Sequence, residues 1–188
     1  MNKELLACVD LNCVPTGKYV IRDDFYTGKY PGANVCGIAY YPFLSTGDEV
    51  LLLLTERAQG KENKPGKISV PSQHWDYQTS DDECLAKIVH KLGINPVGLK
   101  TADFDFPLGV IQQPHPLQDC KMIVKNCGLL LYPQMKDLVK IHEDHVDKIF
   151  FWSLGKVEEE IMAGTIETFG TDPNELIVAL NRFTETYC

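Results

Sequence analysis

Residues 72–94 read SQHWDYQTSDDECLAKIVHKLGI and carry the strongest structural signal in the chain. Ser80 is followed three residues later by Glu83, the spacing of a capping box, in which the two side chains bond to each other's backbone N–H groups at the start of a helix. Beyond Glu83, apolar residues recur at helical spacing and so share one face: Leu85, Ile88, Val89 and Leu92. Gly93 stands where a helix commonly ends. We therefore expect a loop followed by a helix that begins after Ser80.

The flanks of this stretch predict a sheet. Apolar, β-rich residues at 35–43 and 49–55 surround the turn signal at 45–48, which is typical of a hairpin, and the second run contains four consecutive leucines. A strand without polar alternation is expected to be buried on both faces. Shorter strands are expected at 19–21, 68–70, 103–110, 122–132 and 149–154, a loop at 23–33, and further helices at 157–162 and from Asp172 onward. Strands before, between and after helices predict a mixed sheet with helices on its faces.

The spacing within residues 72–94 resembles the signature of Nudix hydrolases. In that family a glycine opens a loop and helix, a glutamate follows after five residues, and seven residues later comes Arg-Glu-aliphatic-x-Glu-Glu-x-Gly-aliphatic. The span from Ser72 to Ile94 has this length without insertion or deletion, and Ile88, Gly93 and Ile94 match. The strands at 51–58 and 150–154 also resemble family strands, so the resemblance covers roughly residues 35–188.

This resemblance implies an α/β fold, a Nudix-like α/β/α sandwich with a mixed β-sheet. The Nudix-like domain is expected to span residues 35–188. Residues 1–34 are expected to form an N-terminal strand and loop extension packed on that domain.

The chain departs from the family wherever the family places an acid. The opening glycine is Ser72, the first glutamate is Gln78, the Arg-Glu pair is Ala86-Lys87 and the Glu-Glu pair is His90-Lys91. Magnesium takes oxygen ligands, and like charges 4 Å apart repel by about 4 kcal/mol at an effective dielectric near 20. The resemblance with these departures predicts that the metal-dependent pyrophosphohydrolase site is lost, with no metal and no cofactor.

We first consider a remodelled site that binds or transforms a small organic molecule without a metal, by isomerase, cyclase or lyase chemistry. Acid/base catalysis at neutral pH suits imidazole side chains. The candidate catalytic residues are His74, His90 and His115. The candidate ligand-binding residues are Lys87, Lys91, Arg57, Tyr26, Tyr30, Trp75 and Gln78.

Other interpretations of the same residues stay open. Lys87 and Lys91 are also what a solvated helix face would carry, and the protein is then a non-catalytic interaction or ligand-sensing protein. Residual hydrolysis would need relocated carboxylates, for which the candidates are Asp76, Asp81, Asp82, Glu83, Glu143, Asp144 and Asp147. His142 and His145 have a metal-like spacing but lack a clear third ligand.

Composition limits the partners. The chain has 188 residues and a formal net charge of −8, which argues against binding a nucleic-acid backbone. The seven cysteines show no C-x-x-C pair, so we expect reduced, mostly buried thiols in a cytoplasmic protein. Glu4 and Asp10 interrupt the apolar N-terminal run, which argues against a signal peptide, and no stretch is long enough to span a membrane. The expected partner is a small-molecule ligand, and a homodimer is left open.

Overall fold

The structure is a computed structural model that describes residues 3–60, 64–93, 100–102, 109–112, 120–135, 139 and 146–188. His115, a candidate catalytic residue, lies outside the described residues. So do the candidate acids Glu143 and Asp144, together with His142 and His145.

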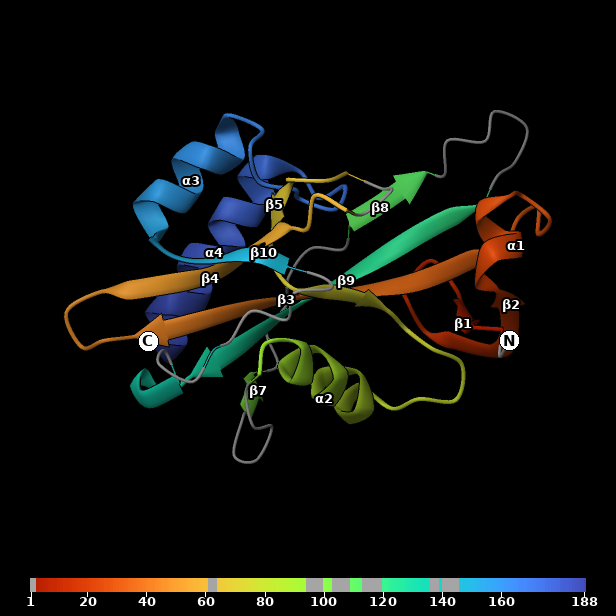
Figure 1. The fold of residues 1–188 in the computed structure, drawn as a ribbon, viewed down its shortest axis with the longest axis horizontal. Coiled ribbons are helices and arrows are strands. Elements are labelled where there is room, and N and C mark those ends of the chain that lie inside the picture. Colours follow the sequence, from red (N-terminus) through yellow and green to blue (C-terminus); the bar gives the residue numbers. More distant parts are fainter. Residues whose placement is uncertain are drawn as a thin grey trace.

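The chain folds as a mixed sheet with helices on both faces (Figure 1). The strands are β1 (Leu5–Val9), β2 (Pro15–Ile21), β3 (Asn34–Ser45), β4 (Val50–Arg57), β5 (Ile68–Ser69), β6 (Ser72–His74), β7 (Lys100–Ala102), β8 (Gly109–Gln112), β9 (Lys121–Leu131) and β10 (Val146–Ser153). The helices are α1 (Arg22–Tyr26), α2 (Asp81–Lys91), α3 (Leu154–Met162) and α4 (Pro173–Tyr187), with a 3-10 turn at Pro133–Met135. One path through the sheet runs β10-β4-β3-β1-β2, and β9 pairs in parallel with β3 along its length. The predicted α/β class and mixed sheet are confirmed.

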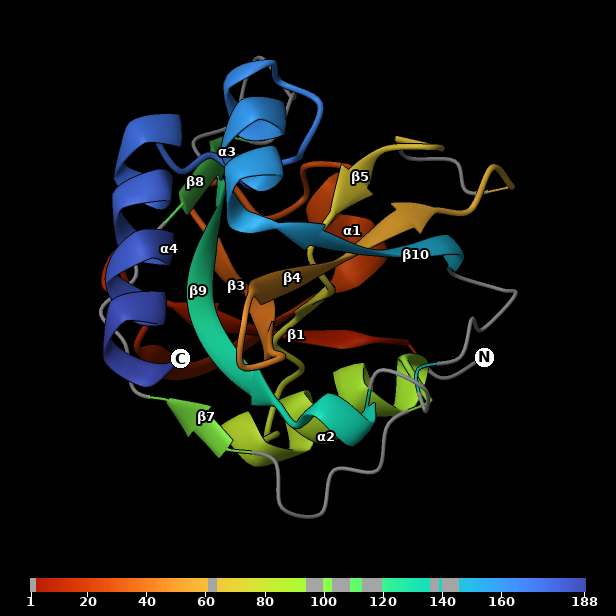
Figure 2. The same ribbon diagram turned by 90° about the vertical axis from the view of Figure 1, so that its left-hand side faces the viewer.

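The leucine run of β4 divides its side chains between two cores. Leu51 and Leu53 belong to the core cluster that contains the apolar face of α2. Leu52 and Leu54 belong to the cluster that contains residues of α3 and α4. Because alternate residues of a strand point to opposite faces, both faces of β4 are buried, and α2 lies across the sheet from α3 and α4 (Figure 2). This is the expected α/β/α sandwich.

Helix α2 begins and ends as its sequence predicts. The Ser80 side chain accepts a hydrogen bond from the Glu83 N–H, and the Glu83 carboxylate accepts one from the Ser80 N–H at 2.7 Å. Gly93 follows the helix with a φ of 67°, a left-handed conformation that glycine adopts without steric cost.

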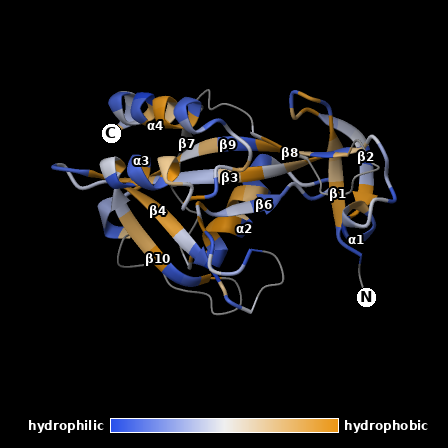
Figure 3. Cartoon of the chain, turned by 90° about the horizontal axis from the view of Figure 1, so that it is seen from above, coloured by the Kyte–Doolittle hydropathy of each residue, from blue (hydrophilic) through white to orange (hydrophobic). Residues whose placement is uncertain are grey.

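The N-terminal segment is more regular than expected. Residues 23–33 were expected to be a loop, but α1 begins at Arg22, and β1 forms a hairpin with β2 that extends well beyond the expected strand at 19–21. The hairpin and α1 lie at one end of the molecule, away from α3 and α4 (Figure 3). They pack on a third cluster of buried residues, namely Leu6, Val20, Phe25, Val35 and Cys120.

One cysteine pair corrects the expectation of reduced thiols throughout. A disulfide joins Cys13, in the β1–β2 turn, to Cys36 in β3, and their Cα atoms are 6.2 Å apart. The pairing links positions 23 residues apart in sequence, and without a C-x-x-C spacing it could not be predicted. The remaining cysteines form no disulfide. None of the described helices combines the length and apolar character needed to cross a membrane.

Candidate functional site

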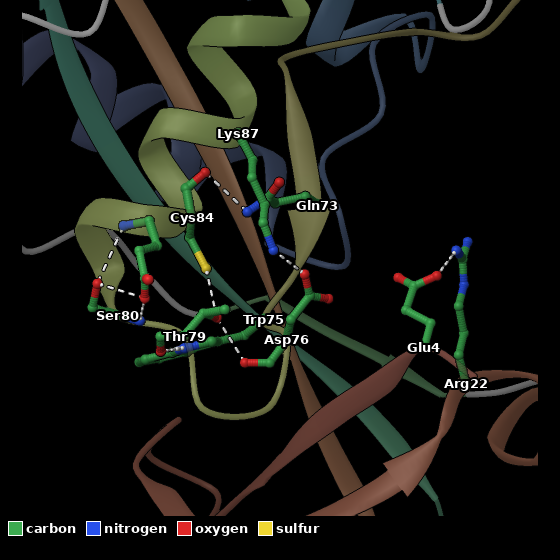
Figure 4. Close-up of polar contacts among 10 residues, drawn as sticks. Glu4, Arg22, Gln73, Trp75, Asp76, Thr79, Ser80, Cys84 and Lys87 are labelled. Carbon is green, nitrogen blue, oxygen red and sulfur yellow. Dashed lines mark hydrogen bonds and ion pairs between the residues drawn. The ribbon is translucent and has the colours of Figure 1, made fainter. Parts of the chain in front are cut away.

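Two ion pairs mark the polar surface where α2 and β6 meet the N-terminal segment (Figure 4). The Lys87 ammonium donates to Asp76 Oδ2 at 2.5 Å, and the Arg22 guanidinium donates to Glu4 Oε2 at 2.7 Å. Asp76 lies just after β6, in the loop that leads to α2, and the backbone of Leu6 in β1 bridges to it. Side chains of the N-terminal segment and of α2, which are far apart in the sequence, thus lie on one surface.

Between these pairs, α1 and β6 supply a hydrogen-bonded phenol and imidazole. Tyr26 Oη lies 2.5 Å from His74 Nε2, although 48 residues separate them in the sequence. Burial, reinforced by the positive charge of Arg22, lowers the pKa of His74 to about 4. Burial also raises the pKa of Tyr26 above its ordinary value of 10.0. Both groups are therefore neutral at pH 7, and the tautomer of His74 decides which of them donates.

Among the described residues of this cluster, Lys91 is the lysine that forms no ion pair. Its side chain is half-buried on the face of α2 that also carries Lys87, one turn earlier. Burial lowers the pKa of Lys91, while Asp76 and Glu4 act on it electrostatically in the opposite sense. Asp76 and Glu4 are already paired with Lys87 and Arg22. Within the described part of the chain, no side chain forms a hydrogen bond or ion pair with Lys91.

Side-chain bonds fix α2 against β6. Gln73 Nε2 donates to the Cys84 carbonyl at 2.9 Å, and the Trp75 indole N–H donates to the Thr79 carbonyl at 2.9 Å. The first bond ties β6 to the first turn of α2, and the second closes the loop between them. The positions of Lys87 and Lys91 relative to His74 are therefore set by several independent contacts.

The remaining candidate residues are placed differently. Trp75 is 9% exposed within the α2 core, and the Tyr30 hydroxyl accepts a hydrogen bond from the Ile21 N–H, so both have structural roles. Gln78 is exposed in a left-handed turn with a φ of 64°. His90 is exposed near the end of α2. Arg57, the last residue of β4, is exposed and acts electrostatically on Tyr26.

Comparison with solved structures identifies the architecture. A C. elegans Ap4A hydrolase matches with a TM-score of 0.59 at 11% identity, over 81% of this chain and 98% of that one. A protein of Deinococcus radiodurans matches with a TM-score of 0.60 at 15% identity, over 93% and 98%. The NUDIX domain of Shewanella oneidensis NrtR, complexed with ADP ribose, matches with a TM-score of 0.55 at 12% identity, over 86% and 98%. This chain has the Nudix fold. No family model matches its sequence, and no curated relative is found by sequence.

The described residues of the loop and helix at 72–93 bring together few of the oxygen ligands that a magnesium ion takes. The positions that match family acids hold Gln78, Lys87, His90 and Lys91. Among the described residues, no three His, Cys, Asp or Glu side chains form a group that could hold a metal ion. Several nearby acids already have structural partners: Asp76 with Lys87, Asp81 with Lys125, Glu83 with Ser80 and Asp147 with the Gln59 N–H.

Sequence reasoning missed part of this Nudix surface. Glu4 and Arg22 lie in the N-terminal extension, from which only Tyr26 and Tyr30 were named as candidate site residues. Asp76 was considered only as a relocated metal ligand, whereas it accepts a hydrogen bond from Lys87. The pairing of β1 with residues 75–77, which brings these groups together, has no local signal in the sequence.

Proposed function

We propose that this Nudix-fold protein binds a small organic anion without a metal, at the surface that α2 and β6 form with the N-terminal segment, and acts on it by proton transfer. The observation that carries the proposal is the Lys91 ammonium, half-buried beside two completed ion pairs and a neutral imidazole. Burying a charge without a counter-charge costs free energy. An anion that pairs with Lys91 would offset this cost, which favours its binding.

The charge balance of this surface favours a singly charged group. Lys87 and Arg22 are paired with Asp76 and Glu4, which leaves the positive charge of Lys91 on α2, with the exposed Arg57 acting on Tyr26 from the end of β4. A lysine ammonium acts as a compact point charge, in contrast to the planar fork of arginine. A carboxylate or another monoanion is thus the preferred ligand group. The net charge of −8 does not oppose this, because binding depends on the local potential.

Tyr26 and His74 support the second half of the proposal. Two neutral groups joined by a hydrogen bond can deliver a proton at one atom and accept one at the other, as isomerisation, cyclisation and elimination require. His74 is the member of the predicted trio that lies within this cluster. His90 is exposed on α2, and a role for His115 remains a prediction.

Binding is tested by calorimetry and thermal shift in the presence of EDTA. The panel contains pyruvate and benzoate as monoanions, and ADP-ribose because the NrtR domain was solved with it. For any ligand that binds, Lys91→Glu should weaken the affinity by roughly 1–3 kcal/mol. Lys156→Glu makes the same charge change on α3, across the sheet, and should leave the affinity unchanged. Equal affinities of the wild type and Lys91→Glu would remove Lys91 from the site.

Proton transfer is tested separately from binding. A ligand that binds is incubated in D₂O with the wild type and with His74→Gln, and exchange of its C–H protons is followed by NMR. Exchange that requires His74 supports acid/base chemistry. Binding without exchange would leave a ligand sensor, the alternative that the sequence left open. Residual hydrolysis by relocated acids would appear instead as metal-dependent cleavage of ADP-ribose.

A further inference from the structure

The Cys13–Cys36 disulfide closes a loop that contains much of the N-terminal side of the site. Cys13 lies in the turn between β1 and β2, and Cys36 lies in β3. The chain between them carries Arg22 and Tyr26. Both cysteines are buried: Cys13 is 6% exposed and Cys36 is fully covered. The disulfide therefore constrains the positions of Arg22 and Tyr26.

The turn at Cys13 is unfavourable for a cysteine unless its side chain is used. Cys13 has a φ of 62°, a left-handed conformation that costs free energy for any residue with a Cβ atom. The Asp10 carboxylate holds the turn by accepting hydrogen bonds from the N–H groups of Asn12 and Val14, both at 2.9 Å. Glycine or asparagine would suit this position better. We infer that a cysteine stands at position 13 because it forms the disulfide with Cys36.

The hairpin is also tied directly to the loop that carries Asp76. The Ala7 N–H donates to the Trp75 carbonyl, and the Tyr77 N–H donates to the Leu5 carbonyl, each at 2.9 Å. Movement of β1 would therefore also displace residues 75–77, which follow His74 in the sequence. The third hydrophobic cluster, which holds the hairpin and α1 in place, is the smallest of the three. Elements with few buried contacts open at low free-energy cost.

We propose that the Cys13–Cys36 disulfide is a redox-dependent clamp that holds β1, β2 and α1 against His74 and Asp76, and that its reduction lets this segment open. Its consequence for ligand binding rests on the proposed function of the site. Its structural effect does not.

The redox step is thiol–disulfide exchange with a small thiol. The thiolate attacks Cys13 Sγ, the less deeply buried sulfur, and Cys36 leaves as a thiolate that takes up a proton. A second thiol attacks the mixed disulfide, which releases the Cys13 thiol and a small-molecule disulfide. The reverse exchange with an oxidised low-molecular-weight disulfide re-forms the clamp. Because both sulfurs are covered, each direction requires the hairpin to open.

The first experiment reads His74 without any ligand. Its charge state is measured by NMR at pH 5.5 in the oxidised protein and after reduction with dithiothreitol. In the closed form the imidazole should be neutral, since burial holds its pKa at about 4. Opening should move it toward the ordinary value of 6.5, at which about 90% would be protonated. Identical charge states in both forms would overturn the clamp.

The second experiment measures backbone opening and the disulfide itself. Hydrogen exchange at the Ala7 and Tyr77 amides should speed up at least tenfold in reduced protein and in Cys13→Ser. Cys8→Ser, a change at a cysteine of β1 that forms no disulfide, should exchange like the oxidised wild type. Alkylation of Cys13 in the unreduced protein would show that the bond is absent and would refute the proposal. Since neither readout uses a ligand, failure of anion binding would leave these results unaffected.

Discussion

His74 is the residue whose surroundings make the sharpest prediction about pH. Its folded pKa of about 4 lies below the ordinary 6.5, so the unfolded chain binds a proton first as the pH falls. The difference in pKa contributes to the free energy of unfolding. This contribution is complete above pH 6.5 and is lost as the pH falls from 6.5 to 4. Between pH 7 and 5 the wild type should lose about 2 kcal/mol more stability than His74→Gln. Urea unfolding of both proteins at the two pH values measures the difference, and parallel losses would contradict it.

We expect the Lys91 ammonium to destabilise the ligand-free protein and to stabilise a bound anion. Lys91→Met removes a half-buried ammonium without a counter-charge, so the ligand-free protein should become more stable by roughly 1 kcal/mol. Lys87→Met is the matched control one turn away. It leaves Asp76 unpaired at a partly exposed site and should destabilise by less than about 1 kcal/mol. Chemical denaturation at neutral pH measures both, and a destabilised Lys91→Met would indicate a structural role.

At the scale of elements, α2 depends on its first turn. Ser80→Ala removes the hydroxyl that accepts from the Glu83 N–H and should lower the unfolding free energy by about 1 kcal/mol. Because α2 carries Lys87 and Lys91, the same change should also weaken binding of an anion. Ser72→Ala, at an exposed serine of β6, is the control and should leave stability nearly unchanged. Equal midpoints of the two variants in thermal unfolding would show that the cap is dispensable.

Elements with a local pattern were predictable, and elements that depend on distant partners were not. The Ser80 cap, the stop at Gly93 and the hairpin of the four leucines follow from periodicity and turn chemistry, and the structure has all three. Helix α1 has five residues and no side-chain cap, so nothing in residues 22–26 distinguishes it from a loop. Its helical form depends instead on Phe25, which is buried in the third cluster.

At the scale of the whole molecule, the site is formed by segments that are far apart in the sequence, so no single stretch of sequence shows all of its residues. The lysines of α2 and His74 could be predicted from their spacing within the Nudix-like stretch. Tyr26 was also among the candidates, as an aromatic residue of the N-terminal segment, but its hydrogen bond to His74 was not predicted. Glu4 and Arg22 could not be predicted, because the packing of β1 and α1 brings them there. Trp75, an aromatic residue that was named as a ligand contact from the sequence, lies 9% exposed in the core cluster that contains the apolar face of α2.

At the scale of the whole molecule, the net charge of −8 attracts cations in general, so the prediction about metals depends on the local charges of α2. Mg²⁺ or Mn²⁺ should neither raise the melting temperature nor support cleavage of ADP-ribose, because Lys91 carries a positive charge and Asp76 is already paired with Lys87 where carboxylates would bind the ion. The combined variant Lys87→Glu, His90→Glu and Lys91→Glu restores acids at three family positions and is the positive control. If it gains a site, metal at a hundred times Kd should stabilise it by about 2.7 kcal/mol. Metal-dependent release of a nucleoside monophosphate by the wild type would show that carboxylates outside the helix rebuild the site.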